Sequence, residues 1–225
     1  MRRQPPSRFP DPRRAPGDAP LAWGGDLEPP TLLDAYSHGI FPWPTGDGTV
    51  LWWSPDPRAV IPLGGLHVSR SLRRTLTRGR FRCTVDTDFA AVVRGCADRP
   101  GEGTWITEEM IRAYEQLHAL GLAHAVGVRD ADHGALVGGI YGVALGAAFM
   151  GESMFSRATD ASKVALVHLV ERLNAAGFAL FDAQMPTPHL TSLGAVTVTR
   201  DTFLRSLADA LARRTSFAAP AGSPR

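Results

Sequence analysis

The stretch from residue 147 to residue 184 limits the possible folds of this chain more than any other. An apolar strand is predicted over residues 147–154, a helix with an apolar stripe follows and ends at Gly177, and a second strand is predicted over residues 178–184. Two strands joined by a helix in this way form a right-handed crossover and lie parallel in one sheet. The chain must therefore build a sheet that contains a parallel pair.

The rest of the chain adds helices and strands around this unit. Residues that can cap the N-terminus of a helix precede six predicted helices: Thr31, Ser69, Asp86 or Thr87, Thr107, Asp160 and Thr199. Further strands are predicted over residues 123–128 and 136–144 from their apolar runs. The order hairpin, helix, strand, helix indicates an α+β or α/β sandwich over a mixed sheet, and it is similar to the core of acyltransferase folds. We predict the α+β class.

The two ends of the chain differ in composition from its middle. Residues 1–20 hold six Pro and five Arg, which predicts a disordered arm, and residues 215–225 predict a disordered tail. Between them we expect a small N-terminal domain over residues 21–62 and a larger domain over residues 63–214. In the small domain, the Trp- and Pro-rich stretch at residues 41–58 is typical of a minor core beneath a loop.

Several classes of protein are disfavoured. Cys83 and Cys96 show no CxxC spacing, and no H-E-x-x-H motif or cluster of His is present, so neither a metal nor a disulfide framework is expected. The longest apolar stretch, residues 136–149, is short and broken by Gly, so no membrane span is expected. No secretion signal follows Arg2 and Arg3. We expect a cytoplasmic protein without a cofactor.

Positive charge is concentrated in one stretch although the net charge is only +2. Six arginines occur there without an acid among them: Arg70, Arg73, Arg74, Arg78, Arg80 and Arg82. Such a stretch can contact phosphates, or it can be a solvated helix face. Charge alone leaves both interpretations open.

Polar residues within two apolar strands are the candidates for chemistry. Asp182 and Gln184 lie on one face of their strand, because side chains alternate along a strand. We therefore expect the Asp182 carboxylate to hold the Gln184 amide, whose oxygen can bind the amine of an incoming nucleophile. Glu152 stands among apolar residues, where an unpaired carboxylate is costly, so it requires a cation. That cation can be Arg157 or a positively charged substrate. No nucleophile elbow surrounds Ser153, which argues against a hydrolase triad.

Motifs along nearly the whole chain resemble those of the leucyl/phenylalanyl-tRNA–protein transferases. They lie, in collinear order, at residues 22–27, 39–43, 51–58 (LWWSPDPR), 67–72, 103–107, 138–144, 151–157 (GESMFSR), 160–163 and 192–195. The resemblance implies a bacterial enzyme that moves Leu or Phe from aminoacyl-tRNA to the N-terminal Arg or Lys of a protein. The transfer would mark that protein for degradation by the N-end rule.

The resemblance also implies a fold and a set of site residues. The fold would be a small N-terminal domain followed by an acetyltransferase-like (GNAT-type) domain, without metal or coenzyme. Asp182 and Gln184 fall on the family's catalytic pair, and the arginines from Arg70 to Arg82 fall where the family contacts the tRNA acceptor stem. The resemblance places five residues in the region that holds the aminoacyl end of the tRNA: Trp43, Trp105, Ile140, Ser153 and Met154. It places Glu152 on an acid of the substrate site. Ala183 departs from the usual Cys, with little effect expected on the pair.

Two other functions remain open at the level of the sequence. An acetyl-CoA-dependent N-acetyltransferase would fit the strand–loop–helix geometry, but residues 157–162 lack the glycines that cradle a pyrophosphate. A non-catalytic RNA-binding protein would explain the arginines, but it leaves Glu152, Asp182 and Gln184 without a role.

Overall fold

The computed structural model describes residues 7–98 and 104–217, which form two sheets and the helices around them. The smaller sheet has the order β1-β3-β2 and is antiparallel throughout. It consists of β1 (Ala22–Trp23), β2 (Phe41–Pro44) and β3 (Val50–Trp53), with α1 (Pro29–Ser37) between the first two strands in the chain. The Pro-rich stretch expected to be a loop therefore contains a hairpin.

The larger sheet has seven strands in the order β10-β4-β9-β8-β7-β6-β5. Its strands are β4 (Arg58–Val60), β5 (Phe81–Val85), β6 (Ala123–Asp130), β7 (Leu136–Leu145), β8 (Ala148–Ser156), β9 (Leu180–Gln184) and β10 (Val196–Val198). Only β8 and β9 pair in parallel, and the other neighbours are antiparallel. The predicted parallel pair and the α+β class are confirmed.

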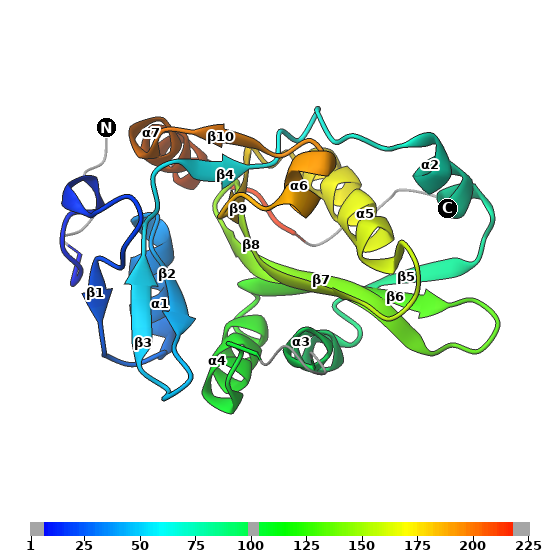
Figure 1. Cartoon of the computed structure of the whole chain (residues 1–225), viewed down its shortest axis with the longest axis horizontal. Helices are drawn as coiled ribbons and strands as arrows, with labels where there is room; N and C mark the ends of the chain where they lie inside the picture. Colours follow the sequence, from blue (N-terminus) through cyan, green and yellow to red (C-terminus); the bar gives the residue numbers. More distant parts are fainter. Residues whose placement is uncertain (1–6, 99–103, 218–225) are drawn as a thin grey trace.

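Helices cover both faces of the larger sheet, as Figure 1 shows. One face carries α5 (Ala161–Ala175), with α2 (Arg70–Thr77) beside it, and the other carries α3 (Phe89–Ala97) and α4 (Glu108–Ala119). The short α6 (Pro188–Ser192) follows β9, and α7 (Arg200–Leu211) contacts β8 and β9 near the smaller sheet. Each face thus buries apolar side chains against its helices.

Three of the predicted helix caps are present, and three differ. The side chains of Ser69, Thr107 and Thr199 each accept a backbone N–H of the first helical turn. Thr31 lies inside α1, which begins earlier because Pro29 and Pro30 suit the first turn of a helix. Asp160 precedes α5, but its carboxylate binds the side chains of Thr75 and Lys163 and accepts no backbone N–H of the helix.

The third difference lies at α3. Asp88, one residue after the predicted Thr87, occupies the N-cap position of this helix. Asp86 instead accepts the backbone N–H of Ala125 at 2.8 Å and pairs with the ring of His124. Asp86 therefore binds the neighbouring strand β6 and does not cap α3.

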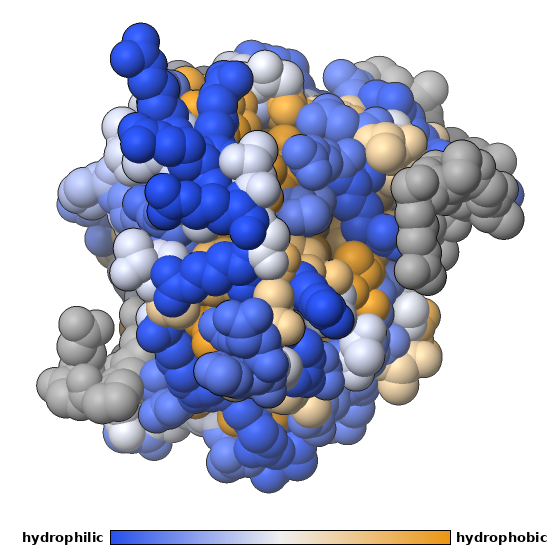
Figure 2. Space-filling view, turned by 90° about the vertical axis from the view of Figure 1, so that its right-hand side faces the viewer, coloured by the Kyte–Doolittle hydropathy of each residue, from blue (hydrophilic) through white to orange (hydrophobic). Residues whose placement is uncertain are grey.

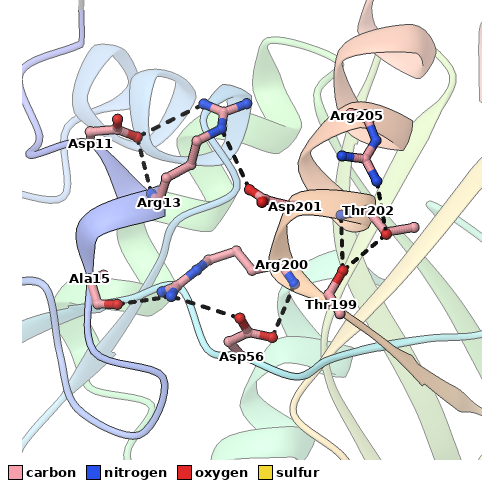
Figure 3. A network of polar contacts seen from close by, with 9 residues as sticks. All are labelled: Asp11, Arg13, Ala15, Asp56, Thr199, Arg200, Asp201, Thr202 and Arg205. Atoms are coloured by element: carbon pink, nitrogen blue, oxygen red, sulfur yellow. Dashed lines mark hydrogen bonds and ion pairs between the residues drawn. The ribbon is translucent and has the colours of Figure 1, made fainter.

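Residues 7–20 differ from the disordered arm that composition predicts, because they pack against the rest of the chain. The Phe9 ring lies 4.7 Å from that of Trp52. Buried Arg200 donates to the carbonyl oxygens of Ala15, Pro16 and Ser54 at 2.7–3.3 Å. Figure 3 shows this region, including the backbone of Arg200 bound to Asp56 and the ion pair between Arg13 and Asp201. The Arg200 guanidinium binds backbone carbonyl oxygens of this segment, and amino-acid composition alone does not predict such contacts.

The domain limits also differ from expectation at two points. β4 begins at Arg58 and belongs to the larger sheet, although residues 21–62 were expected to form the small domain. At the other end, Phe217 is buried against Phe149 and Phe178, within the predicted tail. Residues 1–6 of the predicted arm, residue 103 of the 103–107 motif and residues 218–225 of the tail lie outside the described residues.

Candidate active site

A small cavity opens where β8 and β9 separate. The two strands pair only from Ala148 to Met150 on β8, and each continues beyond that pairing. The cavity has a volume of about 80 Å³ and is lined by Ile61, Ile140, Gly151, Glu152, Ser153, Met154, Leu166, Phe181, Ala183, Gln184 and Leu190. Most of this lining is apolar, with Glu152, Ser153 and Gln184 as the polar exceptions. Five predicted site residues are therefore brought together here.

Asp182 lies beside this cavity as part of a buried ion pair. Its carboxylate accepts Arg58 Nε at 2.8 Å and Arg58 Nη2 at 2.6 Å, a bidentate arrangement. Asp182 is 0% exposed and Arg58 is 1% exposed. The positive charge that a buried carboxylate requires thus comes from β4, and the sequence analysis did not identify it.

Gln184 is held by its backbone and its side chain in different ways. Its backbone N–H donates to Asp182 Oδ1 at 2.8 Å, and its φ is +63°, a left-handed conformation that is rare outside glycine. Its side-chain Nε2 donates to Glu152 Oε1 at 2.8 Å. The expectation that the Asp182 carboxylate holds the Gln184 side-chain amide is wrong, because Glu152 does so instead.

Glu152 is buried and accepts hydrogen bonds on both oxygens. Tyr114 on α4 donates to Oε2 at 2.6 Å, and the Tyr114 hydroxyl is also 2.6 Å from that of Tyr36 on α1. Burial raises the pKa of Glu152 to about 7, and the nearby charge of Asp182 adds to the increase. The suggested ion pair with Arg157 is absent from the described residues, because Arg157 pairs with Asp98 on the surface.

These hydrogen bonds form one buried polar chain that begins and ends at α1. Arg58 Nη1 donates to the carbonyl oxygen of Gly39, just after α1, at 3.2 Å. From Arg58 the chain passes through Asp182, Gln184, Glu152 and Tyr114 and ends at Tyr36, inside α1. The N-terminal segment thus contributes directly to the arrangement of the site.

The two predicted tryptophans lie together, away from the lining of this cavity. Trp43 on β2 and Trp105, just before α4, have ring centroids 5.1 Å apart. Both are partly buried and pack against the core that contains Tyr36 and Tyr114, whereas Ile140 belongs to the core beneath α5. The structure therefore separates the predicted substrate residues into an apolar cavity and a Trp pair.

The six arginines from Arg70 to Arg82 are all exposed and lie on α2, in the connection that follows it, and on β5. Figure 2 views the molecule from this side and shows a face that is largely hydrophilic. No described residue forms an ion pair with any of the six, as expected from the absence of neighbouring acids. The positive charge of the stretch is therefore not neutralised by the described surface.

Comparison with known proteins decides the family. The family model described as leucyl/phenylalanyl-tRNA protein transferase matches residues 60–208, and the model of its N-terminal domain matches residues 25–56. This chain belongs to the leucyl/phenylalanyl-tRNA–protein transferase family. The sequence-based assignment of an aminoacyltransferase is thereby confirmed.

Relatives in the transferase family resemble the chain over most of their length. The leucyl/phenylalanyl-tRNA–protein transferase of Anaeromyxobacter dehalogenans strain 2CP-C is 56% identical over 92% of this chain and 89% of the relative. That of Aromatoleum aromaticum is 56% identical over 85% and 81%. A solved structure, L-PGS from Bacillus licheniformis, matches 83% of this chain and 71% of its own at 11% identity with a TM-score of 0.45, too distant to bear on function.

The described residues contain neither a candidate metal site nor a helix that could span a membrane. No group of three or more His, Cys, Asp or Glu within residues 7–98 and 104–217 is placed to hold a metal ion. In the same ranges, no helix has the length and apolar character needed to cross a membrane.

Sequence reasoning missed three residues of the site in this transferase: Arg58, Tyr114 and Tyr36. A signal existed for Arg58, because an acid in an apolar strand requires a cation and this Arg stands in a short apolar strand. No comparable signal existed for the tyrosines. Their positions at helical spacing are those of ordinary core residues, and only the tertiary structure brings their hydroxyls to Glu152.

Proposed function

We propose that this chain transfers Leu or Phe from aminoacyl-tRNA to the N-terminal Arg or Lys of acceptor proteins, in the cytoplasm, at the cavity between β8 and β9. The proposal rests on one observation: Gln184, with its side-chain amide, is among the residues that line this mostly apolar cavity. An apolar lining suits the Leu or Phe side chain, and a fixed amide suits the orientation of an amine. Family membership supports the same reaction.

The reaction needs positioning and the movement of one proton. The acceptor amine attacks the ester carbonyl of the aminoacyl-tRNA, the C–N bond forms, and the ester C–O bond breaks. The amine loses a proton and the ribose oxygen of the tRNA gains one. Because the ester is already activated, holding the two substrates together supplies much of the rate.

Gln184 is suited to orient the amine. Its Nε2 is committed to Glu152, so its Oε1 is the side-chain atom left to accept a hydrogen bond from the amine. No described residue donates to Oε1 in the free protein. A neutral amide is a poor base, so we assign Gln184 to orientation.

Glu152 is suited to accept the proton that the amine loses. It lines the cavity, it is bound to the Gln184 amide, and burial raises its pKa to about 7. A carboxylate with this pKa is partly ionised at neutral pH and can both take and return a proton. We further propose that Trp43 and Trp105 contact the 3′ end of the tRNA and that the exposed arginines contact its acceptor stem.

The fold of the larger domain fits this use. Two parallel strands that separate beside a helix leave a V-shaped opening, as in acetyltransferase-like folds, and we propose that kinship for the domain that contains the larger sheet. The residues after β8 make no glycine-rich cradle for a pyrophosphate, which favours an aminoacyl-tRNA donor over a coenzyme.

A transfer assay tests the proposal. The purified chain is incubated with radiolabelled Leu-tRNA or Phe-tRNA and with peptides that begin with Arg, Lys or Glu. We expect label in the Arg and Lys peptides and not in the Glu peptide. Gln184→Ala should retain the fold and lose most of the transfer. No transfer by the wild-type chain to any peptide would refute the function, and full transfer by Gln184→Ala would refute the site.

A further inference from the structure

Arg58 is a charged residue beside the site that is almost completely buried. Its side chain is 1% exposed. The guanidinium carbon lies over two aromatic rings, 4.7 Å from the centroid of Phe41 and 4.4 Å from that of Phe203. These two cation–π contacts restrict the movement of the guanidinium.

Each of the three guanidinium nitrogens also donates a hydrogen bond. Nε and Nη2 bind the two oxygens of Asp182, and Nη1 binds the carbonyl oxygen of Gly39. Gly39 cannot easily be another residue, because a Cβ there would lie 2.6 Å from Leu204 and 2.9 Å from Phe203. The position of Arg58 is therefore fixed by the backbone after α1, by two rings and by one carboxylate.

The consequence of this position appears at Gln184. The carboxylate that Arg58 holds also accepts the backbone N–H of Gln184, whose φ of +63° is unfavourable for a non-glycine residue. Gln184 pairs with Ala59 of β4 beside a register shift between Ala59 and Val60, so the pairing of the two strands is irregular at this residue. The link from Arg58 through Asp182 restrains Gln184 in addition to this pairing.

We infer that Arg58 is a positioning residue of the transfer reaction, acting through Asp182 to hold Gln184 against Glu152. This inference rests on the proposed function. Arg58 does not reach the cavity, so its loss should slow the reaction of bound substrates without weakening their binding. A residue that only stabilised the fold would instead change the amount of folded enzyme.

A second buried arginine provides the matched control. Arg200 is 7% exposed and binds backbone carbonyls and Asp56, and it forms no hydrogen bond or ion pair with Asp182 or Gln184. Replacing either arginine with lysine retains the charge and loses the planar set of donors. Both variants should have a lower melting temperature than the wild type. Only Arg58→Lys should also lower kcat.

The experiment measures kcat and KM for charged tRNA in Arg58→Lys and Arg200→Lys, each corrected for the folded fraction. For Arg58→Lys we expect kcat to fall at least about tenfold, because small misplacements of reacting groups cost about that much or more. Its KM for charged tRNA should stay within about twofold of the wild type. For Arg200→Lys, both constants should stay within about twofold.

A double-mutant cycle tests whether Arg58 acts through Asp182. In the background of Asp182→Asn, the added change Arg58→Lys should lower kcat by less than about threefold, because the link is already broken. Additive losses, a wild-type kcat in Arg58→Lys, or equal kcat losses in both lysine variants would overturn the inference. If the wild-type chain itself makes no peptide bond, the proposed function fails, and the inference fails with it. If the wild-type chain is active, the kcat and KM values of the arginine variants alone decide whether the inference holds.

Discussion

Asp182 and its guanidinium partner are fully removed from water, so the two substitutions that remove its charge should differ in their effect on stability. Asp182→Ala leaves Arg58 charged, buried and without its carboxylate, which typically costs about 3–5 kcal/mol. Asp182→Asn keeps the volume and one acceptor oxygen, so its loss should be smaller. Urea unfolding measures both. Equal stability of the two variants would contradict the assigned pairing.

The raised pKa of Glu152 should make the stability of the protein depend on pH. The folded protein holds this proton up to about pH 7, while the usual value for Glu is 4.5, so stability falls as the pH rises through this interval. Glu152→Gln has no such titration. Between pH 5 and pH 8, the stability of the variant relative to the wild type should therefore rise by on the order of 2–3 kcal/mol. Urea unfolding at the two pH values checks this, and a pH-independent difference would contradict it.

The same residues show how far a sequence can predict a site. Asp182, Gln184 and Glu152 stand out because polar residues in apolar strands are costly, and the structure brings them together. Their actual partners were not predictable from spacing. The hydrogen bond from Gln184 to Glu152 joins β9 and β8, which are neighbours only because of the crossover. Tyr114 lies on α4, which covers the face of the sheet opposite to α5.

At the scale of one element, the arginines of α2 make a prediction about salt. Arg73 and Arg74 are exposed and have no acidic partner among the described residues. If they contact phosphates of the tRNA, Arg73→Ala with Arg74→Ala should reduce the salt dependence of tRNA binding by about one to two units in the log–log slope. The preference between Leu and Phe should not change.

The control for this test is a second pair of exposed arginines, on other helices. Arg112 on α4 and Arg205 on α7 carry the same charge away from α2. Filter binding over a range of salt concentrations should give the wild-type slope for the Arg112→Ala, Arg205→Ala variant. Equal slopes for both double variants would show that the tRNA docks elsewhere.

Elements with a clear periodicity were predictable, and short elements were not. The crossover from β8 through α5 to β9 follows from apolar runs of adequate length, and it is present. β4 and β10 have three residues each, too few to show alternation. β2 contains two prolines, which normally argue against a strand, but it lies at the edge of its sheet, where prolines are tolerated.

At the scale of the whole molecule, the segment before residue 20 should contribute to stability. Phe9 packs on Trp52, so Phe9→Ala should lower the free energy of unfolding by about 1–3 kcal/mol. Trp23→Ala is the control, because that ring is 77% exposed and its loss should cost less than about 0.5 kcal/mol. Both variants should keep the wild-type kcat. Equal stability losses would mean that the Phe9 contact contributes nothing.

The place of Arg58 in the chain has a consequence for recombination. The two family models match residues 25–56 and 60–208, so this residue belongs to neither module. Its partners nevertheless lie in both: Gly39 and Phe41 before the junction, Asp182 and Phe203 after it. In a chimaera that joins the halves of two relatives, the buried guanidinium would therefore have partners from both parents. Both halves must fit it for the site to form. A cut in the exposed turn at residues 46–48 meets the same requirement, because Gly39 and Phe41 still lie before it and Arg58 after it.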